Sequence, residues 1–391
     1  MDLKNILRTL YALFGFAIIN LAIISCNDNK ISNQDCEDPF GRPDGYTQVN
    51  LVADTNGLFP TPKRIDPTLV NAWGIVATDD ACGKLYIAAN NQGKVVVYDT
   101  AGNQKEDPIV IPNRVVGAIG TPTGLALNKT KSFTIPGTNE VSILIIASED
   151  GLISAWSGRQ STNGGSDTLF QSAIIVAGGK DVNAVYKGVA IASDGGSDFI
   201  YAANFKEQRI DVFDANFQVV TNKLFIDNSI PSDFGPFNIH EIDGLLYVTY
   251  AKRKAPDVIG NVDDVAGPGN GYINIFTTAG ILVKRFASQG ALNSPWGIIK
   301  TPKNFSPTFL SNSVLVANFG DGFINTFNSN GEFTGAIELN VSTAVDIQGI
   351  WGLVLLRGDK FSSKDKSLIY FTAGPDEEKH GLFGFLRSRF K

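Results

Sequence analysis

The chain has very few of the residues that most metal and redox sites use. Its 391 residues include one methionine, two histidines and three cysteines. Two histidines are too few for a multi-histidine metal site, and one methionine cannot line a methionine-rich binding groove. The chain also has no Gly-x-Ser-x-Gly nucleophile motif, Cys-x-x-Cys pair or phosphate-binding glycine loop. These absences disfavour the common catalytic classes.

Charge is sparse as well. Charged residues make up 18% of the chain, and the formal net charge is −6. Nucleic-acid binding requires a basic surface, so we expect no nucleic-acid partner. What the chain does have is 43% hydrophobic residues and 40 glycines, above the usual glycine share of roughly 7%. This composition predicts a large core with many tight turns.

The first 25 residues have the pattern of an export signal. Lys4 and Arg8 precede an apolar run, Thr9–Ser25, that only Asn20 interrupts. A basic segment followed by a short apolar one is typical of a signal peptide, and a membrane span needs about 20 residues. A small residue before Cys26 resembles the lipobox of bacterial lipoproteins, whose cysteine is lipidated. We therefore expect an exported protein, lipid-anchored to a bacterial membrane through Cys26, with an ordinary secretory signal or an uncleaved anchor as alternatives.

The segment after the signal, residues 26–45, is polar and rich in Asn and Asp, which predicts a flexible tether. Cys36 lies in this tether, and Cys82 lies in a turn before the apolar segment Leu85–Ala89. Disulfides persist in the oxidising compartments that exported proteins enter. A Cys36–Cys82 disulfide is therefore one expectation, and two free thiols are the other.

One phrase recurs six times in residues 46–391 and defines their fold. Each copy begins with a two-residue slot and continues through an apolar segment, a turn and a further apolar segment. The slots are Trp73-Gly74, Thr123-Gly124, Lys187-Gly188, Phe237-Asn238, Trp296-Gly297 and Trp351-Gly352. Runs such as Ile143–Ala147 do not alternate, as is typical of strands buried on both faces. Repeats of roughly 40–50 residues with four short strands are typical of propeller blades, so the sequence predicts an all-β, six-bladed β-propeller in one domain.

The last repeat has no segment that could form a fourth strand. The alternating segment Tyr46–Ala53 precedes the first repeat and has no other partner. We expect it to pair at the outer edge of the last blade, which closes the ring and removes an exposed edge. The alternative is seven blades, if residues 46–62 contain a degenerate repeat.

The repeat geometry also predicts one ligand-binding face. In a blade, the start of the first strand and the end of the antiparallel second strand share one mouth of the central channel. Together with the following turns, this rule gives the candidate ligand-binding residues Trp73, Asn90, Glu149, Asn204, Tyr250, Trp296, Asn318, Asp321, Trp351 and Asp376. Aromatic, amide and acidic groups around a concavity are typical of ligand sites. The alternative is that the tryptophans wedge blades together and the asparagines form turns.

Two features of this face allow more specific hypotheses. If a cation binds there, the ligands to test are Glu149, Asn204, Asn318 and Asp321, since Ca²⁺ takes six to eight oxygen ligands. The turn of the fourth repeat is also enlarged, with residues 252–271 running from basic to acidic to Gly-Pro-Gly. Long loops in compact folds are often functional. This loop starts at the predicted mouth and could cover it as a lid, with surface decoration as the alternative.

Several phrases resemble an uncharacterised bacterial family of secreted propellers, some members of which end in a PEP-CTERM sorting tail. The matching segments are residues 66–74, 186–190, 202–205, 237–239, 247–252, 263–271, 293–297, 318–322 and 371–384. The resemblance implies a six-bladed propeller and an exported protein, and it brings no catalytic residues. The chain differs from the tailed members because it ends in Arg387–Lys391 without an apolar tail.

Two function classes follow from these observations. The first is a non-catalytic binding or scaffold module, monomeric and cofactor-free, that binds a glycan, peptide or protein at the channel mouth. The second is a hydrolase resembling the calcium-dependent lactonases and esterases with six-bladed folds, in which a cation at the mouth polarises the substrate.

Overall fold

A computed structural model describes residues 45–79, 83–158, 171–178, 183–254, 263–340, 343–356 and 367–389. The chain separates into one unit of Met1–Arg42 and another of Pro43–Lys391, and all described residues belong to the second. The predicted signal peptide, the lipidation site Cys26, the cysteines Cys36 and Cys82, and the tether as far as residue 44 lie outside the described residues. The boundaries predicted for the signal, the tether and the propeller domain stay predictions.

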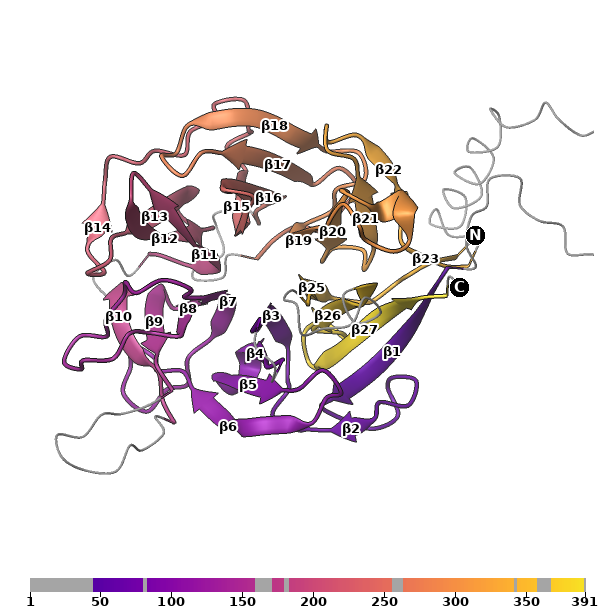
Figure 1. The fold of residues 1–391 in the computed structure, drawn as a ribbon, viewed down its shortest axis with the longest axis horizontal. Coiled ribbons are helices and arrows are strands. Elements are labelled where there is room, and N and C mark those ends of the chain that lie inside the picture. The colour runs from indigo at the N-terminus through magenta and orange to yellow at the C-terminus, as the bar shows by residue number, and fades with distance from the viewer. Residues whose placement is uncertain are drawn as a thin grey trace, which may run out of the picture. The chain divides into compact units, whose positions relative to one another are not determined.

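Six β-sheets of four or five strands make up most of the described part of the chain, and their first strands surround a common centre (Figure 1). The first blade is β3 (Ala72–Ala77), β4 (Leu85–Ala89), β5 (Lys94–Tyr98) and β6 (Gln104–Val110). The second blade is β7 (Pro122–Leu127), β8 (Leu144–Ser148), β9 (Leu152–Trp156) and β10 (Ile174–Gly178). The third blade is β11 (Tyr186–Asp194), β12 (Ser197–Asn204), β13 (Arg209–Phe213) and β14 (Val219–Val220). The fourth and fifth are β15 (Phe234–Ile242), β16 (Leu245–Lys252), β17 (Gly271–Phe276) and β18 (Leu282–Ser288); and β19 (Pro295–Lys300), β20 (Val314–Asn318), β21 (Ile324–Phe327) and β22 (Phe333–Ala336). The fold is the predicted six-bladed propeller.

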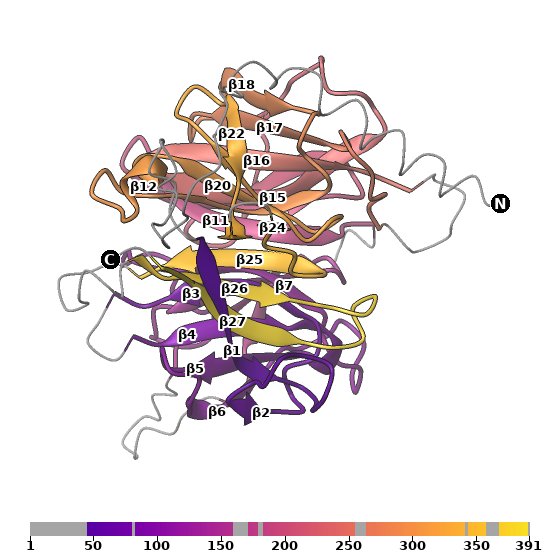
Figure 2. The same ribbon diagram turned by 90° about the vertical axis from the view of Figure 1, so that its right-hand side faces the viewer.

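The sixth blade contains both ends of the described chain. Its strands are β25 (Ile350–Leu355), β26 (Ile369–Ala373), β27 (Leu382–Ser388), β1 (Tyr46–Ala53) and β2 (Arg64–Ile65), in that order from the centre. Strand β1 pairs antiparallel with β27, from Tyr46 opposite Ser388 to Ala53 opposite Leu382 (Figure 2). The predicted closing strand is confirmed, and the strand within residues 46–62, from which a seventh blade would have had to be built, belongs to this sheet.

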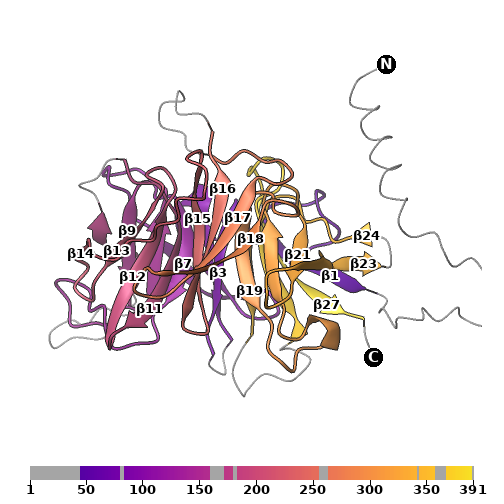
Figure 3. The same ribbon diagram turned by 90° about the horizontal axis from the view of Figure 1, so that it is seen from above.

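Smaller elements complete the described chain. A short hairpin of β23 (Glu338–Asn340) and β24 (Thr343–Ala344) follows the fifth blade and lies beside β1 (Figure 3). Two 3₁₀ turns, η1 (Asn90–Gln92) and η2 (Thr308–Leu310), flank β4 and β20. Among the described residues, no helix is long and apolar enough to cross a membrane.

The core lies between the blades. Strands β4, β8, β9, β20 and β26 are buried at every position. One apolar cluster, for example, joins Ile145 and Ile153 of the second blade to Ile200 and Phe213 of the third. Burial of apolar surface stabilises by about 25 cal/mol per Å². Each sheet therefore buries both faces against its neighbours, which explains the unbroken apolar runs in the sequence.

Candidate functional site

The six slots form a ring at one end of the channel, as the repeat geometry predicts. In the six blades, the residues at the start of the first strand pair with the end of the second. The pairs are Ala72–Ala89, Pro122–Ser148, Tyr186–Asn204, Pro236–Tyr250, Pro295–Asn318 and Ile350–Ala373. The pairing register then shifts within the next residues of every first strand. Such bulges release backbone groups from the ladder, and these groups contact the neighbouring blade.

The second slot position explains why glycine recurs there. A Cβ on Gly188 would lie 2.0 Å from Oδ1 of Asn238 in the next blade, and one on Gly74 would lie 2.5 Å from the Thr123 carbonyl oxygen. Gly124, Gly297 and Gly352 meet the following blade in the same way, the last against Trp73. At the one slot without glycine, Asn238 Nδ2 donates to the Trp296 carbonyl at 3.1 Å. The ring is closed by backbone-to-backbone approach between blades.

The three slot tryptophans fill the channel instead of facing solvent. Trp73 stacks on Trp351 with ring centroids 3.6 Å apart, and Phe319 stacks on the other side of Trp351 at 3.9 Å. Trp296 packs edge-on against both other tryptophans, at 6.1 and 5.7 Å. All three tryptophans are buried. They can therefore form the floor of a site at the mouth, and packing accounts for their positions.

Only some of these indole N–H groups have partners. Trp296 Nε1 donates to the Lys187 carbonyl at 3.0 Å, a bond between the fifth and third blades. Trp351 Nε1 donates to Asn71 Oδ1 at 3.3 Å. Trp73 Nε1 is buried and has no hydrogen-bond partner among the described residues. Hydrogen bonds thus connect two of the three tryptophans to Lys187 and Asn71.

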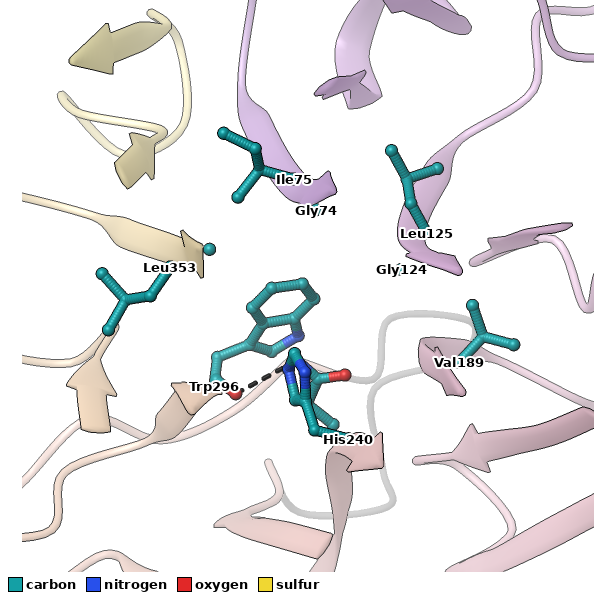
Figure 4. A pocket seen from close by; sticks show the side chains of 10 residues that line it. Gly74, Ile75, Gly124, Leu125, Val189, His240, Trp296 and Leu353 are labelled. Carbon is teal, nitrogen blue, oxygen red and sulfur yellow. Dashed lines mark hydrogen bonds between the residues drawn. The ribbon is translucent and has the colours of Figure 1, made fainter. Parts of the chain in front are cut away.

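A small cavity of about 10 Å³ lies in the channel, lined by slot glycines, Leu125, Leu353, Trp296 and His240 (Figure 4). This is roughly the space that one water needs. His240 Nε2 lies 2.9 Å from Asn238 Nδ2, so the imidazole accepts that hydrogen bond. Burial lowers the pKa of His240 to about 4. The histidine is therefore a neutral packing residue of the channel.

A buried lysine lies at the mouth above the tryptophans. Lys187 Nζ lies 2.5 Å from Glu149 Oε1 and 4.9 Å from the Trp73 ring centroid. The Lys187 side chain is 4% exposed and that of Glu149 27%. Burial by itself lowers the pKa of Lys187, but the Glu149 carboxylate outweighs burial and the net pKa is raised. Lys187 is thus a fixed ammonium, because a lysine nucleophile would need a lowered pKa.

The first and second blades hold the Glu149 carboxylate in place. Asn90 Nδ2 donates to Glu149 Oε2 at 3.0 Å and to the Pro122 carbonyl at 3.2 Å. Two of the predicted site residues, Asn90 and Glu149, are therefore in contact. The structure adds Lys187 to them.

A second carboxylate reaches the mouth from the sixth blade. Asn71 Nδ2 donates to Glu378 Oε1 and to Asn91 Oδ1, each at 3.1 Å, and Asn91 Nδ2 donates to the Glu378 carbonyl at 2.8 Å. Three successive residues, 376–378, have φ between 54° and 65°. Non-glycine residues rarely adopt this left-handed conformation. The resulting turn directs Glu378 inward and leaves Asp376 and Glu377 exposed.

The enlarged turn of the fourth blade contributes two more acids. Of residues 252–271, positions 255–262 lie outside the described residues. Lys254 Nζ lies 2.9 Å from Asp263 Oδ2, and Asp263 is close enough to act electrostatically on Lys187 and Glu378. Asp264 is half-buried and is close enough to Lys187 to interact with it electrostatically. Part of this loop therefore lies at the mouth, and a lid function stays a prediction.

We call Glu149, Lys187, Asp263, Asp264 and Glu378, with Asn71, Asn90 and Asn91, the mouth cluster. Its four carboxyl groups outnumber the two ammonium groups that face them, Lys187 and the Lys254 partner of Asp263. Burial raises the pKa of Glu378 to about 7, although Lys187 and Asn71 act in the opposite direction. Burial also raises the pKa of Asp264, and that of the neighbouring Asp150 to about 6. These carboxyl groups have too little compensating positive charge.

The other predicted site residues lie within their own blades. Asn204 accepts from Val185 N and Glu207 N and donates to Asp211 Oδ2 at 2.8 Å. Asn318 Nδ2 donates to the Ala291 carbonyl at 2.8 Å and to Asp321 Oδ2 at 3.3 Å. Tyr250 is buried in the core between the third and fourth blades. Asp376 lies 3.6 Å from Lys379 at the surface. Turn formation and packing account for these contacts.

The four residues named as calcium ligands lie in three blades, and Glu149 is paired with Lys187. Among the described residues, no group of three or more His, Cys, Asp or Glu side chains is arranged to hold a metal ion. Calcium binding stays a prediction. Within the described part of the chain, the mouth cluster does not provide a set of ligands arranged for a metal ion.

Sequence reasoning placed Lys187 and Glu378 at the rim of the mouth but did not select them as candidate ligand-binding residues, and it missed Asn71 and Asn91. One signal was available, since Lys187 occupies a slot that holds an aromatic residue in four of the other five repeats. No comparable signal distinguished Glu378 from the adjacent Glu377.

Comparison with known proteins gives relatives without an assigned activity. The sequence matches no family model. It is 34% identical over 368 residues to the uncharacterized protein L690 of Acanthamoeba polyphaga mimivirus, covering 92% of this chain and 91% of the relative. It is also 34% identical over 352 residues to the uncharacterized protein R648 of the same virus, covering 88% and 82%. Among solved structures, an α-L-arabinofuranosidase of Fusarium graminearum with an iminosugar inhibitor superposes with a TM-score of 0.50 and 12% identity, covering 88% of this chain and 98% of that one.

The fold and the site thus define a six-bladed β-propeller with an aromatic-filled channel and a charged mouth. The chain belongs to the family of uncharacterised proteins that includes L690 and R648. The arabinofuranosidase likeness, at 12% identity, shows the fold alone. The bacterial origin, the sorting-tail relatives and the lipoprotein signal that the sequence suggests stay predictions.

Proposed function

We propose that the protein is a non-catalytic binding module whose mouth cluster receives a positively charged group of its ligand. The observation that carries this proposal is the convergence of carboxyl groups from the second, fourth and sixth blades around the single buried ammonium of Lys187. Lys187 and Lys254, which pairs with Asp263, cannot together compensate all of them. A ligand amine or guanidinium would supply the missing charge.

The raised pKa values of the mouth carboxyl groups support this proposal. A carboxyl group with a pKa of about 7 is largely protonated at mildly acidic pH, because its ionised form is desolvated. A cation bound beside it favours the ionised form and expels the proton. Near a protein surface, two opposite charges 4 Å apart attract by about 4 kcal/mol. An amine at Glu378 therefore gains attraction that the unliganded mouth does not offer.

Several features support binding without turnover. Lys187 is a fixed ammonium in contact with Glu149, His240 is neutral in the channel, and the tryptophan floor closes the channel below. The mouth therefore suits recognition of a group that approaches from solvent. Ligands with this chemistry include a lysine- or arginine-bearing peptide and an amino sugar.

We further propose that the module is exported and held at a bacterial membrane by a lipid on Cys26, with residues 26–45 as a tether. This rests on the sequence pattern of the first 26 residues. Membrane fractionation of the full chain and of Cys26→Ser tests it. The wild type is expected in the membrane fraction and the variant in the soluble exported fraction, and an unchanged distribution would refute lipidation.

The binding proposal is tested by calorimetric titration with trilysine blocked at both termini, beside the same peptide acetylated on its side chains. Glu378→Gln removes the inward carboxylate. Glu377→Gln is the matched control, since it makes the same charge change one residue away on a side chain that is 87% exposed. We expect trilysine to bind, Glu378→Gln to weaken binding about tenfold, and Glu377→Gln to change it less than twofold.

Two results would refute the binding proposal. Equal binding of the acetylated peptide would show that charge is not recognised. Equal effects of the two substitutions would show that the affinity reflects the net charge of the protein and not the mouth cluster.

A further inference from the structure

An exposed apolar loop borders the mouth cluster. The loop, Asn113–Gly120, connects β6 to β7 and has the sequence NRVVGAIG. Val115 is 64% exposed, Val116 100% and Ile119 58%. Single exposed apolar residues are ordinary, but several together on one surface often mark an interaction site. We call Val115, Val116 and Ile119 the rim loop residues.

The loop is held in one shape by polar contacts. Asn113 Oδ1 accepts from Val115 N at 2.8 Å, and Asn113 Nδ2 donates to the Ile119 carbonyl at 2.9 Å. A backbone bond from Ala118 N to the Val115 carbonyl, 3.0 Å long, closes the turn. These hydrogen bonds hold the loop in one conformation without a partner. Preorganisation of this kind lowers the entropic cost of binding.

Further contacts fix the loop next to the mouth cluster. Asn113 Nδ2 donates to Asp150 Oδ2 at 2.8 Å, and Arg114 donates to the Asp150 carbonyl at 3.1 Å. Asp150 directly follows Glu149, the partner of Lys187. The loop also packs on the turn between β4 and β5, where a Cβ on Gly93 would lie 2.9 Å from Ile119 Cβ. Apolar and acidic surfaces are therefore adjacent on one face.

We propose that the rim loop residues and the mouth cluster form one docking surface for a protein segment that carries a basic side chain beside bulky apolar side chains. The basic group would enter the acidic mouth, and the apolar side chains would cover Val115, Val116 and Ile119. This inference rests on the proposed function and adds the partner class. Interfaces of this kind combine a desolvated apolar contact with a charged anchor, for which arginine is favoured.

Charge decides between a protein and a lipid surface as the occupant. Asp150 contacts the loop and directly follows Glu149 in the chain, and carboxylates are repelled by anionic headgroups. The loop also presents short branched side chains, whereas tryptophan and tyrosine are the residues favoured at membrane interfaces. A protein segment that combines a basic side chain with apolar side chains fits both the acidic and the apolar part of the surface.

The test selects dodecapeptides from a random phage-displayed library on the immobilised propeller and measures the affinity of the enriched peptides. The substituted protein is Val115→Ser/Val116→Ser. Val219→Ser is the matched control, because Val219 is 66% exposed on the outer strand β14. Both variants change only exposed side chains and are expected to unfold at the wild-type temperature.

The expected peptides combine Lys or Arg with Leu, Ile, Val or an aromatic residue. They should bind Val115→Ser/Val116→Ser at least tenfold more weakly than wild type, and Val219→Ser within twofold. Affinity unaffected by Val115→Ser/Val116→Ser would overturn the docking surface. If Glu378→Gln still weakened the binding of those peptides, the proposed function would stand without the docking surface.

Vesicle sedimentation tests whether the rim loop residues bind a lipid membrane instead of a protein. Zwitterionic phosphatidylcholine vesicles and vesicles with added phosphatidylglycerol are expected to leave the wild type in the supernatant. Sedimentation that Val115→Ser/Val116→Ser abolishes would assign the loop to a membrane and overturn the proposal, and so would a selection that enriches no peptide.

Discussion

Lys187 Nζ and Glu149 Oε1 are 2.5 Å apart and join the third blade to the second at the mouth of the channel. The ammonium also lies over Trp73 of the first blade. A charge pair, an aromatic floor and the ring of slots therefore meet at one point. We therefore expect the stability of the ring and the charge of the mouth both to depend on this lysine.

Removing only the ammonium should be costly. In Lys187→Met, Glu149 is left half-buried without its counter-charge, and breaking such a pair costs about 3–5 kcal/mol. Lys187→Met/Glu149→Gln removes both charges and should recover most of that loss. Urea unfolding of wild type, Lys187→Met, Glu149→Gln and the double variant measures the coupling between the two residues, and additive effects would mean that the pair contributes nothing to stability.

Two tryptophans with similar burial should differ in their tolerance of phenylalanine. Trp296 Nε1 donates to the Lys187 carbonyl, whereas Trp73 Nε1 has no partner among the described residues. Both substitutions remove a ring of similar volume, but Trp296→Phe also leaves a buried carbonyl unsatisfied. We expect it to be more destabilising than Trp73→Phe by about 1–2 kcal/mol in urea unfolding. Equal losses would show that this cross-channel bond has no energetic role.

The slot glycines are required for spacing between blades and not for their backbone angles. In Gly188→Ala the new Cβ would overlap Asn238 Oδ1, 2.0 Å away. Gly117→Ala is the control, because Gly117 has φ 86° but open space around it. We expect the first variant to lose several kcal/mol and the second about 1 kcal/mol. The reverse order would contradict the explanation given for the ring.

The pKa of Glu378 predicts a pH dependence of stability. In the folded state it is raised from 4.5 to about 7, so the folded protein holds a proton that the unfolded chain releases. The stability that comes from this proton is present below about pH 4.5 and is lost as pH rises through about 7. Glutamine does not titrate, so Glu378→Gln does not lose this stability as pH rises. The variant should therefore gain roughly 1–3 kcal/mol over wild type between pH 4.5 and 7.5, whereas a constant difference would exclude a raised pKa.

Much of the fold could be predicted because it repeats. The Trp-Gly slots, the unbroken apolar runs and the alternation in Tyr46–Ala53 are local patterns with a direct physical cause, and they gave the six blades and the closing strand. The rim was also predictable, since it follows from antiparallel pairing. These features need no knowledge of individual side-chain directions.

The site was less predictable because it depends on such directions. The tryptophans lie in the predicted ring, but their side chains turn into the channel and stack, a result of packing among distant blades. Glu378 reaches the mouth through three successive left-handed residues, whereas non-glycine residues adopt this conformation singly and rarely in a run. Lys187 meets Glu149 only because the second and third blades are neighbours in the ring.

The central claim is that the mouth cluster binds a cation and that Glu378 must be ionised to do so. The direct measurement is the dissociation constant of blocked trilysine between pH 5 and 8, for wild type and Glu378→Gln. The side-chain amines of the peptide remain charged throughout this range, so the change reports the protein. Wild-type affinity should rise with pH and level off above about pH 7, with less rise in Glu378→Gln, where only groups such as Asp150 still titrate. An affinity independent of pH, or the same pH profile in both proteins, would contradict the claim.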